Sequence, residues 1–336
     1  MTRLPSATRH MLRRTALASG LAACLAAAPT GQALAQSGAW PQRPVTLVVG
    51  YPAGGSTDLV ARTLATDLSS RLGQPVVIEN VGGAGGSLGA QKVALAQPDG
   101  YTLLVGANNE LAINALVRRS VKYQAKNFTP LSLLATQPLV LTTSPATGIR
   151  NTADFLRTVK AKPGAFSYGS SGVGTALHMT GEMVKQSGGL FMTHIPYRGT
   201  GPLTNDLIGG NLEYGVYVLS SALPLIKAGK ITPIGTSEHK RSPVTPDVPA
   251  LSENPALKDV DINVWFALLG PAGLPEAIQA KLKGAVNDIL KASDFRKGME
   301  ASGSVVPASQ PDMAVFIAAE TAKYRKIVEF AHITDE

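Results

Sequence analysis

Glycine-rich turns that join an apolar run to a helical pattern constrain the fold of this chain more than any other feature. The first, VGYPAGGSTDLVAR, occupies residues 49–62, and related turns occur at 80–90 (NVGGAGGSLGA) and 168–178 (YGSSGVGTALH). A strand that ends in glycine and leads directly into a helix is typical of a mostly parallel sheet with helices on its faces. The sequence therefore predicts an α/β fold.

The pattern along the chain also suggests how it divides. Strands are expected at 44–49, 75–79 and 101–106, and helices at 56–72, 87–96, 151–160 and, towards the end, 275–290, 293–301 and 311–330. Two long extended passages, 131–143 and 262–269, bracket a middle block of shorter units. We expect them to be two strands crossing between two lobes. The predicted boundaries are 40–138 plus 268–336 for domain I and 139–267 for domain II, and 336 residues suffice for two domains.

The first 35 residues predict an export signal. Four arginines precede an uncharged run at 15–28, and a small-x-small cleavage site ends at Ala35. The run is too short to span a bilayer. Two alternatives stay open: Arg13-Arg14 resembles a twin-arginine signal, and Cys24 ends a lipoprotein-like box. We favour ordinary cleavage after Ala35, which places the mature protein outside the cytoplasm.

Composition limits the partners. Cleavage would remove four arginines and no acidic residue, which lowers the formal net charge from +8 to +4. Basic residues form only short pairs, and aromatic residues make up 5% of the chain, which argues against a nucleic-acid or sugar platform. Cys24 is the only cysteine, so the folded part has no disulfide and no thiolate metal ligand.

The glycine turns predict anion binding. The first N–H groups of a helix have no partner inside the helix, and its N-terminus carries a partial positive charge. Glycine lets a ligand approach the backbone because it has no Cβ. Such turns also simply connect strands to helices, and this simpler interpretation applies to any one of them. Three in one chain favour a site that holds a carboxylate or a similar anion through main-chain amides.

Nucleotide sites and enzyme sites find little support. The chain has no phosphate-binding P-loop motif, and Leu88 stands where the dinucleotide fingerprint needs glycine. The sequence Gly169-Ser170-Ser171-Gly172 has the wrong spacing for a nucleophile elbow, and the histidines are too scattered to indicate a metal site. We therefore expect no enzyme activity, no cofactor and no metal. His178 remains a candidate because its ring N–H could reach a bound carboxylate.

Several segments in order along almost the whole mature chain resemble the tripartite tricarboxylate transporter substrate-binding receptors, also called Bug receptors. They are WPQRPVTLVVGYPAGGSTDLVAR, NVGGAGGSLGA, PDGYTLLVG, HIPYRGTGPLTNDLIGGNLEY, LPLIKAGKI and WFALLGPAGLP. The resemblance implies a two-lobed periplasmic binding protein of type II, the Venus flytrap arrangement. It implies a receptor that closes around a small organic carboxylate and delivers it to the membrane subunits of a tripartite transporter.

The resemblance also implies the ligand-binding residues, position by position. From the first lobe they are Tyr51, Ala53, Gly54, Gly55, Ser56, Thr57, Asp58, Gly83, Ala84, Gly85, Gly86, Ser87, Ala107 and Asn108. From the second lobe they are Ser170, Ser171, Thr175, His178, Tyr197, Arg198, Gly199 and Asp206. The chain departs from the family at Tyr217, where many relatives have aspartate, and in the polar run Asn108-Asn109-Glu110.

The leading hypothesis is thus a monomeric, non-catalytic periplasmic receptor whose two lobes close on a dicarboxylate, an amino-acid-like acid or an aromatic acid. Two alternatives remain: a periplasmic sensor that presents its closed form to a signalling protein, and a secreted enzyme acting on a carboxylate. The enzyme would need a nucleophile or a base with an orienting group, and the sequence supplies no such set.

Overall fold

Two groups of parallel strands make up most of the sheet in the computed structural model, which describes residues 40–334. The export signal, its cleavage site and Cys24 lie outside the described residues. The first strand group contains β1 (Val45–Val49), β2 (Val76–Asn80) and β3 (Thr102–Ala107), with β1 parallel to both neighbours. The second contains β5 (Ser167–Ser170), β6 (Thr193–Pro196), β7 (Tyr214–Val218) and β8 (Thr232–Thr236), with β5 parallel to β6 and β7.

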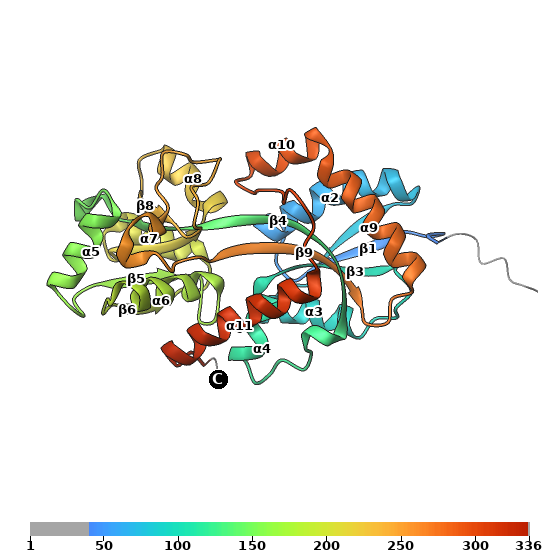
Figure 1. Ribbon diagram of the computed structural model, residues 1–336, viewed down its shortest axis with the longest axis horizontal. Coiled ribbons are helices and arrows are strands. Elements are labelled where there is room, and N and C mark those ends of the chain that lie inside the picture. Colours follow the sequence, from blue (N-terminus) through green and yellow to red (C-terminus); the bar gives the residue numbers. More distant parts are fainter. Residues whose placement is uncertain (1–39, 335–336) are drawn as a thin grey trace, which may run out of the picture. The chain divides into compact units, whose positions relative to one another are not determined.

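Two long antiparallel strands join the groups. Strand β4 (Phe128–Thr143) pairs with β9 (Asn263–Pro271) as far as Pro138, and from Leu139 onwards it pairs with β7. Strand β9 also pairs with β3, which gives the order β2-β1-β3-β9-β4-β7-β5-β6. Strand β8 lies off this path and pairs with β4. Figure 1 shows β4 and β9 running side by side from one strand group to the other. This arrangement confirms the predicted crossing strands.

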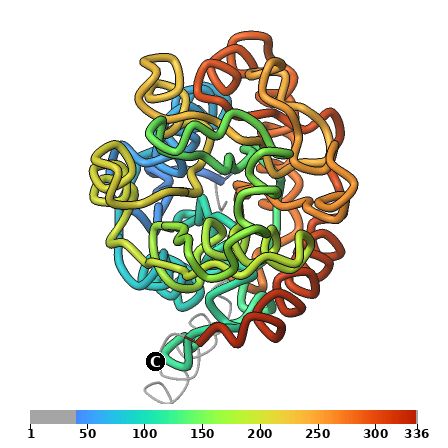
Figure 2. Tube along the Cα trace, turned by 90° about the vertical axis from the view of Figure 1, so that its left-hand side faces the viewer, coloured from blue at the N-terminus to red at the C-terminus, as the bar shows by residue number. Residues whose placement is uncertain are grey.

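Helices connect the strands and cover the sheet. Their bounds are α2 (Ser56–Leu72), α3 (Ser87–Ala94), the π-helix η2 (Asn109–Ile113), α4 (Asn114–Val117), α5 (Thr152–Ala161), α6 (Ala176–Gly188), α7 (Thr200–Gly209), α8 (Leu219–Lys227), α9 (Glu276–Lys291), α10 (Ser293–Ala301) and α11 (Met313–Ala331). Figure 2 shows the orange and red C-terminal helices along one side of the molecule, where α9 and α10 pack against α2, and α11 packs against η2 and α6.

Helix α2 illustrates how local sequence sets these elements. Its predicted stripe, Val60, Leu64, Leu68 and Leu72, is buried in the structure, as apolar residues at helical spacing should be. The helix ends at Gly73, whose φ of 68° lies in the left-handed region and whose N–H bonds to a carbonyl of the last turn. The predicted bounds 56–72 are confirmed.

Sequence patterns missed the short helices around the strand ends. Segment η2–α4 follows β3 directly, and α8 follows β7 with Pro224 inside it. Proline removes a backbone donor and argues against a helix when only local pattern is considered. Packing of Leu219 and Ala222 against the sheet stabilises α8 nevertheless, since both side chains are fully buried.

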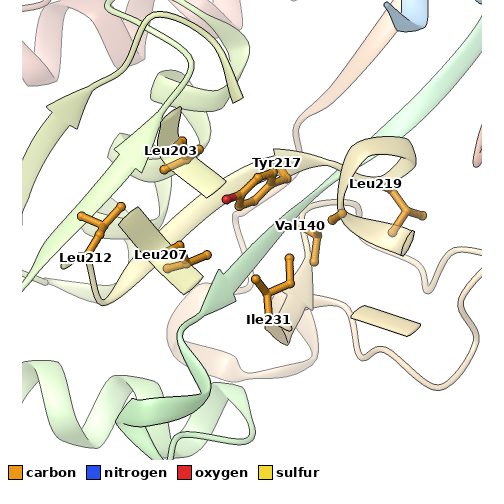
Figure 3. Close-up of a cluster of buried hydrophobic side chains, with 8 residues drawn as sticks. Val140, Leu203, Leu207, Leu212, Tyr217, Leu219 and Ile231 are labelled. Carbon is orange, nitrogen blue, oxygen red and sulfur yellow. The ribbon is translucent and has the colours of Figure 1, made fainter. Parts of the chain in front are cut away.

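Tyr217 belongs to the core of the second strand group. It is fully buried in a cluster with Val140, Leu203, Leu207, Leu212, Leu219, Ala222 and Ile231. Figure 3 shows its ring among these aliphatic side chains.

Residues Pro41–Glu336 form one compact unit. The two-domain division with boundaries at 138/139 and 267/268 stays a prediction. The exchange of strand partners on β4 after Pro138 supports the first boundary, whereas the second one falls inside β9. Within the described residues, no helix combines the length and the hydropathy needed to cross a membrane.

Two helical glycines provide a test of the packing. A Cβ at Gly181 in α6 would lie 2.0 Å from the ring of buried Tyr168, whereas a Cβ at Gly284 in α9 would meet nothing within 4 Å. We expect Gly181→Ala to lower the free energy of unfolding by about 1–3 kcal/mol because it overpacks the core. Gly284→Ala should raise it by about 0.5–1 kcal/mol because alanine favours a helix. Denaturant unfolding measures both, and equal effects would contradict the packing of α6 on β5.

Candidate functional site

A pocket of about 330 Å³ lies where β1, β3, β5 and β7 end and β9 passes. We call it the central pocket. Its lining residues carry no formal charge and are Tyr51, Pro52, Ala53, Gly55, Ser56, Thr57, Ala107, Asn108, Asn109, Ser171, Ala176, Leu177, Val218 and Val264. Polar hydroxyl and amide groups thus meet an apolar wall, which is typical of small-molecule sites.

The N-terminus of α2 opens onto the central pocket. Gly55 is its extended N-cap residue, and no side chain of the described residues caps the helix. The backbone amides of Ser56 and Thr57 consequently have no acceptor among the described residues. The partial positive charge of a 17-residue helix is therefore directed at the pocket without a basic side chain.

Asp58 stabilises the first glycine turn through hydrogen bonds. Its carboxylate accepts hydrogen bonds from the Gly54 amide (2.8 Å), Arg62 Nε (2.8 Å) and Asn80 Nδ2 (2.9 Å). Burial alone would raise the pKa of Asp58, but these bonds outweigh it and lower the pKa to about 2. Asp58 is 2% exposed and does not line the pocket. Predicted as ligand contacts, Asp58 and the Gly54 amide instead bind each other.

The second glycine turn, Gly83–Ser87, does not line the central pocket either. Gly85 O accepts hydrogen bonds from Asn114 Nδ2 (2.7 Å) and from Tyr51 Oη (3.3 Å), and Asn114 also binds Ser87 Oγ. Gly86 has a φ of 89°, and a Cβ there would lie 2.9 Å from Glu110. Glycine is needed at Gly86 because this turn packs against Glu110, behind the wall of the central pocket. The sequence predicts that the turn contacts the ligand, but the turn does not line the central pocket.

The segment after β3 connects the two sides of the pocket. Asn109 Oδ1 accepts a hydrogen bond from the Ala176 amide at the start of α6 (3.0 Å). Asn108 is 1% exposed, and its Nδ2 donates to Asn263 O and Tyr324 Oη. Its Oδ1 has no partner among the described residues. The sequence predicted Asn108 and missed Asn109, although the polar run after a strand end was a signal.

Of the predicted second-lobe residues, Ser171 alone lines the central pocket. Ser170 is fully buried, and its Oγ lies 2.7 Å from His194 Nε2. Thr175 caps α6 by accepting from the His178 amide. Tyr197 Oη donates to Asp206 Oδ2 (2.8 Å) outside the pocket. Burial and this bond raise the pKa of Tyr197 to about 12.

His178, which the sequence predicts as a ligand contact, does not line the central pocket. Its ring is 6% exposed and stacks on His194 with 3.7 Å between ring centroids. Its Nδ1 accepts from the Gly174 amide, and its Nε2 lies 3.9 Å from Glu182. Burial lowers the pKa of His178 to about 4 and, with the neighbouring His178 ring, that of His194 to about 3. Both rings are therefore neutral at pH 7, and neither lines the central pocket.

Arg198 is exposed and Gly199, with a φ of 97°, is the N-cap residue of α7, so this loop also lies outside the central pocket. A neighbouring cavity of about 580 Å³ shares Gly55 and Ser56 with the central pocket. It adds Gly54 and the start of α8 at Ser220 and Ser221. The sequence did not predict this part of α8 as a lining element.

The chemistry of the site is that of binding. Within residues 40–334, no group of three or more histidines, cysteines or acidic residues could hold a metal ion. The lining of the central pocket includes hydroxyls but no histidine or carboxylate that could act as a base. The arrangement can hold an anion with backbone amides and hydroxyls.

Comparison with known sequences gives a consistent result. The sequence model of the tripartite tricarboxylate transporter family receptors matches residues 60–332. The chain is 31% identical to protein BugT of Bordetella pertussis over 292 residues, which cover 86% of this chain and 89% of BugT.

Solved structures are similar over almost the same range. A structure described as R. palustris Rpa4515 with adipate has a TM-score of 0.80 at 32% identity, covering 88% of this chain and 99% of that chain. MatC (Rpa3494) from Rhodopseudomonas palustris with bound malate has a TM-score of 0.75 at 31% identity, covering 86% and 100%. The periplasmic binding protein BugD has a TM-score of 0.77 at 28% identity, covering 88% and 100%.

The stacked histidines predict a pH dependence of stability. The pKa of His194 is lowered in the folded state, so below about pH 6.5 the unfolded state binds the extra proton. Between pH 7 and 5, the free energy of unfolding of the wild type should fall relative to His194→Phe, by up to about 1.4 kcal/mol per pH unit. Subtracting the free energies of unfolding of the two proteins cancels the contributions of the other titratable groups. One of these is Glu110, whose raised pKa makes the folded state more stable as the pH falls.

Denaturant unfolding at several pH values measures this difference. The same replacement at His239, whose side chain is 57% exposed, is the control for the loss of a histidine outside the stacked pair. A constant difference for His194→Phe would mean that the ring is not buried in its neutral form.

Proposed function

Because the chain belongs to the tripartite tricarboxylate transporter receptor family, a family of solute-binding receptors rather than enzymes, we propose that it binds a small organic carboxylate in the central pocket. It delivers this acid to the membrane subunits of a tripartite transporter.

The observation that carries this proposal is the uncapped N-terminus of α2. The amides of Ser56 and Thr57 line a pocket without charged side chains, where a carboxylate can accept two charge-assisted hydrogen bonds. The hydroxyls of Ser56, Thr57 and Ser171 add further donors from the same lining. The positive end of the helix dipole would repel a cation, and the pocket lining has no carboxylate to offset this repulsion.

Two structural relatives support the ligand class. Rpa4515 is described with adipate and MatC with bound malate, and both are acids with two carboxyl groups. The neighbouring cavity beside Gly55 gives this chain room for an acid longer than the central pocket alone would hold. A dicarboxylate is accordingly the first class to test.

The strands β4 and β9 supply a mechanism. Gly55 follows β1 and Ala107 ends β3, both strands of the first group, whereas Ser171 and Ala176 follow β5 of the second. We propose that residues 40–138 plus 268–336 and residues 139–267 act as two lobes, which the bound acid bridges. Closure is then favoured only when the ligand makes contacts on both sides.

The proposed place of action is the periplasm. Periplasmic relatives such as BugD and the predicted export signal at 1–35 support it. In this location the receptor meets a solute before the transporter does.

Ligand binding predicts thermal stabilisation. Malate, succinate and adipate should each be screened by thermal shift on the purified mature protein. A bound acid at a hundredfold excess over its Kd stabilises the folded state by about 2.7 kcal/mol, because only the folded state binds it. The control is dimethyl adipate, which has the same carbon chain without negative charge. Shifts with esters, amines or sugars and none with carboxylates would contradict the ligand class.

A leucine in the first turn should block the pocket. Gly55 has a φ of −78°, and a Cβ there makes only an ordinary contact with Pro52 O at 3.6 Å, so the backbone accepts a side chain. Gly55→Leu should weaken acid binding by about tenfold or more because it fills the pocket. Gly201→Leu is the control, since a Cβ at this exposed helix start meets nothing within 4 Å and lies outside the pocket. Calorimetric titration compares the two, and equal affinities would remove the α2 start from the site.

A further inference from the structure

Glu110 is a buried carboxyl group directly behind the wall of the central pocket. It belongs to η2, is 1% exposed and does not line the pocket itself. Its Oε1 accepts from the Ala107 amide at 2.9 Å, and its Oε2 lies 2.6 Å from Tyr51 Oη. Both partners line the pocket. One carboxyl group therefore fixes two separate parts of the wall.

The same group also orders the second glycine turn. Tyr51 Oη lies 3.3 Å from Gly85 O, and a Cβ at Gly86 would come within 2.9 Å of Glu110 Oε2. The turns after β1, β2 and β3 consequently meet at the Glu110 carboxyl group. A side chain in this position controls the relative placement of all three turns.

The hydrogen bonds at Tyr51 are compatible with either protonation state of Glu110. When Glu110 is ionised, Tyr51 donates its phenolic proton to Oε2. When a proton from water is added to Oε2, this oxygen donates to Tyr51 Oη, and the phenol turns its own proton to Gly85 O. Oε1 accepts from Ala107 in both states. The wall is thus preserved while the charge behind it changes.

We propose that Glu110 is a positioning residue that couples a proton to ligand binding, so that the receptor takes up one proton on Glu110 Oε2 when a carboxylate occupies the central pocket. The proposal rests on the proposed carboxylate site. Its physical basis is repulsion: two negative charges on the two faces of one buried wall disfavour each other, and neutral Glu110 removes the repulsion.

No cationic side chain of the described residues bonds directly to Glu110. Tyr51 faces it from the β1 turn, the Gly85–Ser87 turn has no ionisable side chain, and Tyr123 Oη donates to its backbone carbonyl. Helix α11 packs on η2, and its Tyr324 donates to Glu320 and accepts from Asn108. The charge of Lys323 on the same helix is paired with Glu320 at 2.7 Å.

Arg118, the C-cap residue of α4, carries a positive charge that acts on Tyr123. Burial raises the pKa of Glu110 to about 7, although the bonds from Tyr51 and Ala107 act against this. A second negative charge nearby raises it further. Glu110 is therefore partly ionised at pH 7 in the free receptor and neutral in the bound receptor.

The test compares the Kd of wild type and Glu110→Gln for malate, adipate and succinate between pH 6.5 and 8.5. The ligands stay ionised in this range, since carboxyl groups ionise near pH 4. The wild-type Kd should rise severalfold with pH, with a limit of about tenfold per pH unit. Glutamine keeps an acceptor for Ala107 and a donor for Tyr51, so Glu110→Gln should give a Kd that does not change with pH. At pH 8.5 the variant should bind more tightly than the wild type, which loss of structure would not produce.

Calorimetry in two buffers of different ionisation enthalpy measures the proton directly. Wild type should take up about one proton per ligand near pH 8, and Glu110→Gln none. Glu110→Ala separates positioning from charge: it should bind more weakly at every pH, and the glutamine variant should restore the affinity. The control is Glu238→Gln, because Glu238 is also largely buried with a raised pKa but bonds to Asn263, which does not line the pocket.

Each result has a defined meaning. Wild-type pH dependence that persists in Glu110→Gln, or that disappears in Glu238→Gln, overturns the coupling and leaves the proposed function intact. Failure of every acid to bind at any pH removes the proposed function, and the coupling falls with it. Carbon-13 NMR of the free protein adds an independent check: a Glu110 midpoint below about pH 5 would overturn the coupling even where acids bind.

Discussion

Every other part of the described structure depends on the antiparallel pairing of β4 with β9. Residues Phe128–Pro138 pair with Asn263–Pro271, and the same β4 continues into a second set of partners at Leu139. Backbone hydrogen bonds in a buried sheet leave these strands little freedom. Helix N-termini and turns that follow β1, β3, β5 and β7 are thereby brought to one pocket from distant parts of the sequence.

The site that results keeps formal charge out of the pocket and behind its wall. Asp58 binds the first turn from below, Glu110 binds Tyr51 and Ala107 from behind, and the His178–His194 stack lies under the start of α6. Burial shifts the pKa values of Glu110, His178 and His194, whereas hydrogen bonds lower that of Asp58. The pocket itself offers amides and hydroxyls, which suit an anion that must be both held and released.

Glycine serves two purposes in the three turns that first marked this chain. At Gly55 it leaves the start of α2 open to the pocket, and the backbone there is extended. At Gly86 it provides a positive φ and room for Glu110 and Tyr51. The sequences of the two turns look alike, but one contacts the pocket and the other supports its wall.

The sequence by itself determined the elements whose cause is local. The stripe Val60, Leu64, Leu68 and Leu72 gave α2, the long apolar runs gave β4 and β9, and the ordered set of segments indicated the family, because periodicity and turn chemistry act within a few residues.

Only the tertiary structure decided which polar groups meet. Tyr51 and Glu110 are 59 residues apart in the chain, and Ala176 and Asn109 are 67 apart. No local pattern specifies such a pair, since it depends on how the sheet places the strand ends. For the same reason His178 was predicted at the ligand and lies in the core. Gly54, also predicted as a ligand contact, donates its amide to Asp58.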